Sequence, residues 1–366
     1  MCSIFLDHYI MRLVNVEQLK GGEILGQDIL TSEGSILLRA SSHFKLAYKK
    51  YLTQRHIYEI YIDDEVSKGI IPNPVIPPHI KQSLTRNLEH QFKEVEKFTT
   101  VNLEQMKCLT STIIKELSNT DVIFDVLDLQ HNDEYTYSHC INVSILSCVL
   151  AKKLGFNYED INHIITGALL HDLGKIILPK DILNKPGQLT TSERNIIKTH
   201  CQIGYDIIKN NLSLNAISKV IILCHHERED GNGYPLNKGA DLHLGAKLVA
   251  VADVFDALVA NRPYRLGFAP SNALKILKEQ KLNQDIISIL ENMIAYYPIG
   301  STVKLSNNLI ALVEQNFPNN PNRPLVRVIY NETNNTILNY NLDLRNEANI
   351  HILENSNQFS LDKLRA

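Results

Sequence analysis

The sequence predicts a mainly α protein with a small α/β module at the N-terminal end and a short β-rich tail at the C-terminal end. Apolar residues recur at helical spacing through most of residues 121–297, with hardly any alternating strand pattern there. Short strand-like runs bounded by turn residues occur before and after this region. A chain of 366 residues is long enough for two or three structural units.

The N-terminal module is expected to occupy residues 1–75 and to have a regulatory role. Residues 21–40 indicate two short strands joined by a Ser-Glu-Gly turn. Residues 41–56 then indicate a helix, and residues 58–63 another strand. The module is therefore a small mixed unit.

A proline-rich linker and a connecting helix are expected over residues 76–120. The run IPNPVIPPH, which ends at His79, contains four prolines, and these cannot continue a helix or a central strand. An amphipathic helix follows, since apolar residues recur three or four apart at Ile80, Leu84, Leu88, Phe92, Val95 and Phe98. This stripe could pack on its own domain or pair with a second copy, and we expect it to contribute to a homodimer.

Five predicted helices in residues 121–300 carry polar side chains on their apolar stripes. The third of these helices starts with a capping-box pattern, in which Thr190 is followed three residues later by Glu193. The fourth ends in two adjacent histidines, and the fifth, over residues 246–260, has two aspartates three apart. The polar residues on the stripes are His139, His171, Asp172, His200, His225, His226, Asp253 and Asp256.

A single histidine on an apolar stripe is most often a hydrogen-bonded core residue, and a core aspartate usually pairs with a cation. The occurrence of eight such residues on five helices makes this explanation less favourable. Burying so many polar groups costs on the order of several kcal/mol of folding free energy unless a common binding partner satisfies them. A divalent metal centre would do so, since imidazole nitrogen and carboxylate oxygen are natural metal ligands. The sequence therefore predicts a metal site inside a helical bundle.

The composition restricts the other classes of function. A net charge of -3 and a pI near 6.5 argue against a general binder of nucleic acid polymers or anionic membranes. No apolar run is long enough for a membrane span, and the N-terminus lacks the features of a secretory signal. The six cysteines contain no C-x-x-C pair, which indicates reduced thiols. We therefore expect a cytoplasmic protein.

Six motifs occur in order between Asp133 and Arg265: DEYTYSHCINVS, HDLGK, KTHCQIGYDII, HHEREDGNGYP, VADVFDAL and RPYR. A His-Asp pair alone is a weak signal, whereas HDLGK followed by HHE-x-x-DG-x-GYP is a specific one. Together the motifs resemble the HD-GYP family of bacterial cyclic dinucleotide phosphodiesterases, a branch of the HD hydrolases. The resemblance implies an HD-type helical bundle as the catalytic domain over residues 121–300. The segment PIGSTVKLSNN also resembles this family, and a β-rich C-terminal extension is expected over residues 301–366.

Carried over residue by residue, the resemblance implies two divalent metal ions, iron or manganese. One ion would be held by His139, His171, Asp172 and Asp253. The second would be held by Asp172 as a bridge and by His200, His225 and His226. This arrangement leaves positions for a shared hydroxide and for phosphate oxygens. Some members bind a third metal through a glutamate four residues before the first histidine, but Tyr135 occupies that position here.

The resemblance also implies catalytic and substrate-binding roles. Lys175 and Asp172 would be catalytic, with Lys175 stabilising developing negative charge; the alternative for Lys175 is a salt bridge to a ligand carboxylate. The arginines of RPYR suit the second phosphate, although surface ion pairs would also explain them. The candidate substrate-binding residues are Arg262, Arg265, Gly233, Tyr234 and Pro235.

Several neighbouring residues have supporting roles. We expect Glu227 and Asp230 to fix the loop, and Asp256 to be a hydrogen-bond partner of a ligand or an arginine, or a core salt bridge. Cys201 and Cys224 each adjoin a ligand histidine; buried apolar fillers explain them better than redox control does.

These residues and the resemblance predict a metal-dependent phosphodiesterase that hydrolyses cyclic di-GMP through a metal-bridging hydroxide, with pGpG as the product and further hydrolysis to GMP left open. One alternative is a phosphohydrolase of another nucleotide such as cyclic GMP-AMP. Another is a non-catalytic cyclic di-GMP receptor that signals through the N-terminal module. Inactive relatives would be expected to lack metal ligands, and this chain retains all seven, which favours an enzyme.

Overall fold

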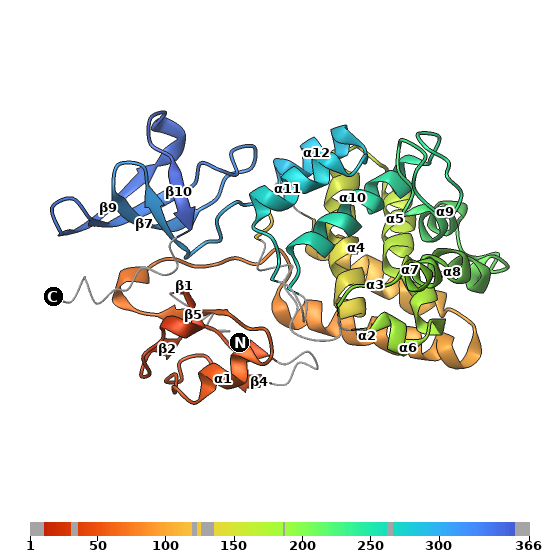
Figure 1. Ribbon diagram of the computed structural model, residues 1–366, viewed down its shortest axis with the longest axis horizontal. Coiled ribbons are helices and arrows are strands. Elements are labelled where there is room, and N and C mark those ends of the chain that lie inside the picture. The colour runs from red at the N-terminus through yellow and green to blue at the C-terminus, as the bar shows by residue number, and fades with distance from the viewer. Residues whose placement is uncertain are drawn as a thin grey trace, which may run out of the picture. The chain divides into compact units, whose positions relative to one another are not determined.

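The computed structural model describes residues 11–30, 36–118, 123–125, 135–185, 187–261 and 266–355. Contacts among them divide the chain into two compact units. One is drawn from residues 75–122 and 129–291, and the other from residues 1–74, 123–128 and 292–366. Helices dominate the first unit and short strands the second, which confirms the predicted mainly α class with strands towards both ends (Figure 1).

The helical unit is a bundle in which α4 contacts α5 and α10, α5 contacts α9, and α8 contacts α9 and the short 3-10 helix η4 (Figure 1). Its elements are α2 (Pro78–Phe98), α3 (Leu103–Glu116), α4 (Tyr135–Lys153), α5 (Tyr158–Leu170), η4 (Leu173–Ile177), α6 (Lys180–Leu183), α7 (Thr191–Lys198), α8 (His200–Ile208), α9 (Ala216–Cys224), α10 (Leu244–Val259), α11 (Pro270–Glu279) and α12 (Gln284–Glu291).

Side-chain caps determine where several of these helices start. Thr190 and Glu193 form the predicted capping box of α7, in which each side chain accepts from the other residue's backbone N–H. The Asn157 side chain caps α5, and the Asn215 side chain caps α9. These caps satisfy N–H groups that have no partner within their own helix.

The amphipathic helix predicted from the stripe Ile80 to Phe98 is confirmed as α2, and a second helix, α3, follows it within residues 76–120. Thr99 adopts the left-handed conformation at φ 53° and ends α2, and the Asn102 side chain then caps α3. Four residues of the apolar stripe, Leu84, Leu88, Phe92 and Val95, are buried within their own unit, where the Phe92 ring lies edge-on to Tyr137 at a centroid distance of 5.4 Å. Phe98, at the end of the stripe, is 61% exposed. The stripe thus packs on its own domain, one of the two arrangements that the sequence allowed, and a homodimer stays a prediction.

His171 and Asp172 were expected on the stripe of a predicted helix, but the structure places both just beyond the helix end. α5 ends at Leu170, and Asp172, at φ -94° and ψ 8°, leads into the 3-10 turn of η4. The turn brings Gly174 against the first residues of α8, where a Cβ on Gly174 would lie 2.0 Å from the His200 carbonyl oxygen. The helix predicted from Thr190 is likewise divided, since α7 and α8 are separate elements on either side of Thr199.

The second unit contains two sheets and a hairpin. β5 pairs with β1 and β2 in an antiparallel sheet, β3 pairs with β4, and a five-stranded antiparallel sheet has the order β10-β6-β7-β8-β9. The bounds are β1 (Arg12–Asn15), η1 (Val16–Gln18), β2 (Ile24–Leu25), β3 (Ile29–Leu30), β4 (Ile36–Leu38), α1 (Tyr48–Thr53), β5 (Glu59–Asp63), η2 (Glu65–Ser67), β6 (Thr302–Leu305), β7 (Leu309–Gln315), β8 (Leu325–Asn331), β9 (Thr336–Asp343), η5 (Leu344–Asn346) and β10 (Ile352–Asn355).

These short strands are tied together by backbone and apolar contacts. The Leu13 N–H donates to the Gly300 carbonyl at 3.0 Å, and Ile70 packs with Ile310 and Tyr330. The predicted Ser-Glu-Gly turn lies between β3 and β4, outside the described residues.

Two further expectations concern cysteines and membranes. The described cysteines, at positions 108, 140, 148, 201 and 224, are free thiols, as the scattered pattern predicted. Among the helices that the structure describes, none has both the length and the apolarity needed to cross a bilayer.

The packing at Gly174 generates a stability prediction. A Cβ on Gly174 would meet the His200 oxygen at 2.0 Å and the Gly204 nitrogen at 2.7 Å, and both are backbone atoms that cannot move aside alone. We expect Gly174→Ala to lower the free energy of unfolding by about 2–3 kcal/mol in urea denaturation. Gly204→Ala is the matched control, since its nearest contact is a side-chain methyl of Ile222 at 3.1 Å. Equal losses in the two variants would contradict this account.

Candidate metal centre

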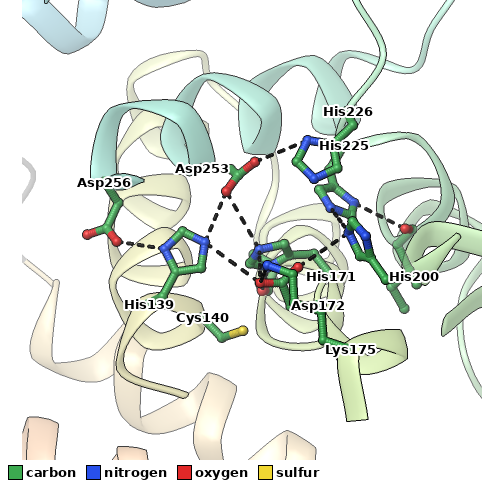
Figure 2. Close-up of polar contacts among 12 residues, drawn as sticks. His139, Cys140, His171, Asp172, Lys175, His200, His225, His226, Asp253 and Asp256 are labelled. Atoms are coloured by element: carbon green, nitrogen blue, oxygen red, sulfur yellow. Dashed lines mark hydrogen bonds and ion pairs between the residues drawn. The ribbon is translucent and has the colours of Figure 1, made fainter. Parts of the chain in front are cut away.

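The seven predicted ligand residues converge in the middle of the helical unit (Figure 2). His139 projects from α4 and Asp253 from α10, whereas the other five lie at or just beyond helix ends. All except His226 are at least nine-tenths buried. The residues come together from five segments: His139; His171 and Asp172; His200; His225 and His226; and Asp253.

One side of the cluster is formed by two histidines and an aspartate. The His139 Nε2 atom lies 3.0 Å from Asp253 Oδ1, and the His171 Nε2 atom lies 3.9 Å from the same oxygen. One ligand atom from each of these three residues lies within 4.8 Å of the others. Asp256 holds the far side of the His139 ring, where the Nδ1–H donates to its carboxylate at 2.7 Å.

The other side is formed by three histidines. The Nε2 atoms of His200 and His225 face one another at 3.2 Å, and the His226 ring contacts both of the other rings. The His226 Nδ1 atom also lies 3.5 Å from Asp253 Oδ2. This second cluster therefore adjoins the first.

Asp172 lies between the two clusters. Its Oδ2 atom is 3.5 Å from His171 Nε2, and its Oδ1 atom is 3.4 Å from His200 Nε2. The Lys175 ammonium donates to Oδ2 at 2.6 Å. Lys175 therefore forms a salt bridge with a predicted ligand carboxylate, which was the alternative to a catalytic role, and this salt bridge lies within the cluster.

Backbone carbonyls fix the tautomer of three of the rings. The Nδ1 atoms of His171, His200 and His225 lie 2.7, 2.7 and 3.1 Å from the carbonyl oxygens of Ala168, Ile197 and Ile222. A carbonyl only accepts hydrogen bonds, so each Nδ1 must carry the proton and each Nε2 must present a lone pair. The lone pairs of His200 and His225 therefore point at one another across 3.2 Å.

Burial keeps most of these imidazoles neutral. It lowers the pKa of His171, lowers the pKa of His200 to about 4 and that of His226 to about 3, and holds the pKa of His225 well below its usual value. His139 differs: burial alone would lower its pKa, but hydrogen bonds to Asp253 and Asp256 raise it to about 9. A cation between His139 and Asp253 would take the place of that proton.

The two carboxylates are ionised and the lysine is charged. Burial alone would raise the pKa of Asp172, but the Lys175 charge and the nearby imidazoles hold it well below its usual value. Burial would likewise raise the pKa of Asp253, but its hydrogen bond to His139 and the positive charge of that ring hold it low. Burial opposes the charge of Lys175, yet the Asp172 carboxylate keeps its pKa above the usual value.

These residues fit a divalent metal centre. His171 Nε2 and Asp172 Oδ1 are buried atoms without a hydrogen-bond partner among the residues that the structure describes. An unsatisfied buried polar atom costs about 1–3 kcal/mol. A cation held between the rings and the carboxylates would satisfy both atoms and would relieve the facing lone pairs. The set of imidazole and carboxylate donors is one that binds divalent metals.

The loop after His226 is fixed from inside by one carboxylate. Glu227 is 2% exposed, and its carboxylate accepts from three successive backbone N–H groups: Leu236 at 2.6 Å, Asn237 at 3.0 Å and Lys238 at 3.0 Å. Asp230 accepts from the backbone and side chain of Asn232, each at 3.0 Å. The expectation that Glu227 and Asp230 fix the loop is confirmed.

The loop places Tyr234 beside the metal cluster. Its ring lies 4.7 Å from the His226 ring at an angle of 32°. Gly233 is required for loop packing, since a Cβ there would meet the Glu227 Cα at 2.4 Å. Pro235 follows in the same loop and is partly exposed. Arg262 and Arg265, the predicted phosphate-binding pair, lie outside the described residues.

Two buried residues at the site, Asn142 and Cys140, were not predicted from the sequence, and Cys201 was predicted only as a buried filler beside a ligand histidine. The Asn142 amide donates to Asp256 at 2.7 Å, which orients the carboxylate that holds His139. Its signal was a polar residue one helical turn after His139. Cys140 has its sulfur beside His171 and Asp172, and Cys201 has its sulfur beside His200 and His225. Burial raises the pKa of both thiols.

Comparison with protein families identifies two regions. Residues 118–286 match the HD domain family, and residues 302–364 match the KOW domain associated with HD domain. The first match covers all seven predicted ligand residues. The second covers the five-stranded sheet.

Curated relatives also match part of the chain. The chain is 31% identical over 217 residues to the cyclic di-GMP phosphodiesterase PA4108 of Pseudomonas aeruginosa, which covers 58% of this chain and 52% of that protein. It is 40% identical over 152 residues to a cyclic di-GMP phosphodiesterase of Thermotoga maritima, covering 40% and 41% of the two chains. It is 32% identical over 178 residues to the 3'3'-cGAMP-specific phosphodiesterase 1 of Vibrio cholerae, covering 46% and 40%.

The chain thus spans about half the length of these relatives, or less. The predicted motifs, the bundle that gathers their histidines and aspartates, and the matches to an HD domain and to relatives named as cyclic dinucleotide phosphodiesterases agree with one another. Residues 118–286 are an HD domain, and they carry the motifs by which the sequence resembles the HD-GYP family.

Proposed function

We propose that this protein is a metal-dependent phosphodiesterase that hydrolyses cyclic di-GMP to pGpG and onward to GMP. The observation that carries the proposal is the convergence of five histidines and two aspartates around atoms that lack partners among the described residues. Relatives named as cyclic di-GMP phosphodiesterases support the choice of substrate. A site of this kind beside the Tyr234 loop suits a nucleotide that has planar bases and two negatively charged phosphates.

We assign two ions, iron or manganese, to the site. His139, His171, Asp172 and Asp253 would hold one ion. Asp172 would also hold the second, together with His200, His225 and His226. The position of Asp172 supports this bridge, because one of its oxygens lies 3.5 Å from His171 Nε2 and the other 3.4 Å from His200 Nε2.

When bound, a pair of divalent ions lowers the pKa of water and offsets charge on phosphoryl oxygens. Lys175 would add a third positive charge, since its side chain is 20% exposed and its ammonium contacts Asp172. Tyr234 would offer a ring face to a guanine base, and the Lys198 ammonium, 5.2 Å from that ring, would attract a phosphate. Arg262 and Arg265 remain our candidates for the second phosphate.

Cyclic GMP-AMP is the second candidate substrate. The Vibrio cholerae relative specific for 3'3'-cGAMP has 32% identity to this chain, close to the 31% of the Pseudomonas aeruginosa cyclic di-GMP enzyme. The metal donors would serve both substrates equally, because the two share the same phosphodiester linkage. Only groups that contact the bases would separate them.

Asp172→Asn tests the proposal directly. We expect the iron- or manganese-loaded protein to release pGpG, and the variant to lose activity on the order of a thousand-fold or more, because the bridging carboxylate is gone. Asp206→Asn is the matched control, since Asp206 lies on α8 with its side chain 46% exposed and pairs with Lys209. Product chromatography with cyclic di-GMP and cyclic GMP-AMP decides the substrate. Tight cyclic di-GMP binding without product by the loaded protein would favour a receptor instead.

Lys175→Met separates catalysis from ion pairing. If Lys175 acts on the phosphate, kcat per loaded metal site falls about 100- to 1,000-fold while the metal content is unchanged. If it serves only as a partner of Asp172, the metal content or the free energy of unfolding changes and kcat per loaded site does not. Lys209→Met is the control, since Lys209 pairs with exposed Asp206.

Asp256→Asn tests the support of His139. The Asp256 carboxylate accepts the His139 Nδ1–H at 2.7 Å, and such contacts orient a ring and strengthen it as a ligand. We expect metal affinity, measured by chelator competition, to fall about 10- to 100-fold. Unaltered affinity would show that His139 needs no such support.

A further inference from the structure

Cys201 is the second residue of α8 and lies directly after His200. The side chain is 0% exposed, and its sulfur is 3.4 Å from His200 Nε2 and 4.0 Å from His225 Nε2. Those two nitrogens are the ones whose lone pairs face each other at 3.2 Å. The Cys201 sulfur and these two nitrogens therefore surround the same small space.

The spacing of these atoms matches that of ligands around a single ion. With metal–nitrogen bonds of about 2.0–2.1 Å and metal–sulfur bonds of about 2.3 Å, donors around a tetrahedral ion lie about 3.3–3.7 Å apart. The observed separations of 3.2, 3.4 and 4.0 Å fall close to this range. Donor atoms of His200, Cys201, His225 and His226 all lie within 4.8 Å of one another.

An independent atom points to the same place. Asp172 Oδ1 is buried, has no hydrogen-bond partner among the described residues, and lies 3.4 Å from His200 Nε2. A hydrogen bond from the Cys201 thiol to His200 Nε2 would account for the position of the sulfur. It would leave Asp172 Oδ1 and the lone pair of His225 Nε2 without a partner.

We propose that the Cys201 thiolate is a ligand of the metal ion held by His200, His225 and His226. The inference rests on the metal centre of the proposed function and adds a sulfur donor to it. When the ion binds, a metal–sulfur bond forms, the S–H bond breaks and the proton passes to water, with no change of oxidation state. A sulfur donor gives this side a preference for Fe²⁺, Co²⁺ or Zn²⁺ over Mn²⁺.

Cobalt provides a direct probe of the bond. Metal-free, full-length protein is titrated with Co²⁺ under reducing, oxygen-free conditions, and both bound cobalt and the absorption spectrum are recorded. We expect a near-ultraviolet sulfur-to-cobalt charge-transfer band in the native protein. In Cys201→Ser the band disappears while the visible bands of imidazole-bound cobalt remain. Zinc affinity falls about tenfold or more in this variant, and manganese affinity changes much less.

Two variants serve as controls. Cys148→Ser removes another fully buried thiol, on α4 and outside the donor clusters, and keeps the band. Cys140→Ser removes the thiol beside His171 and Asp172, so loss of the band in this variant alone would move the ligand to Cys140 and overturn the proposal. Cys201→Ala replaces the serine variant if serine unfolds the protein.

Absence of the band in cobalt-loaded native protein, or its persistence in Cys201→Ser, would also refute the sulfur ligand. Neither result depends on turnover. The phosphodiesterase proposal therefore stands or falls separately, on release of pGpG.

Discussion

The withdrawal of seven ionisable side chains from water is the constraint on which the helical unit depends. Each ion buried without compensation costs several kcal/mol, about as much as the entire stability of a small domain. Part of the compensation is local, because backbone carbonyls accept from three of the rings and Lys175 faces Asp172. Some of the nitrogen and oxygen atoms that face inward have no such partner among the described residues. These atoms are lone-pair donors and carboxylate oxygens, which are the groups that bind a cation.

Helix ends are what allow so many donors to meet. A residue in the middle of a helix shares its face only with residues three or four away, so one helix rarely aims consecutive side chains at one point. Here α5 ends just before His171, α8 begins at His200, and α9 ends just before His225. Beyond a helix end the chain can turn, and the adjacent pairs at positions 171–172 and 225–226 can both point inward. The mid-helix residues His139 and Asp253 complete the site from two longer helices.

The residues that the sequence predicts best are those on periodic stripes and in specific motifs. The helical class and the capping box at Thr190 follow from local patterns, and the convergence of the seven predicted ligand residues follows from the motifs that carry the family resemblance. The breaks in helices do not, since Thr99 and the turn at Asp172 depend on which surfaces the chain meets later. The contact between Gly174 and α8 shows why: the glycine fits an adjacent backbone that no local pattern reveals.

The loop beyond the histidines has a property that follows from how Glu227 holds it. In the loop, the Glu227 carboxylate accepts hydrogen bonds from the main-chain N–H groups at positions 236, 237 and 238. Every amino acid except proline has this N–H group. Leu236 and Lys238 are exposed, so substitution of their side chains leaves these three hydrogen bonds in place. Asn237 differs, because its backbone has a φ of 54° and its side-chain amide donates to the Gly233 carbonyl. Substitutions at Leu236 and Lys238 can therefore change the exposed surface of the loop while Glu227 keeps its backbone beside the histidine cluster.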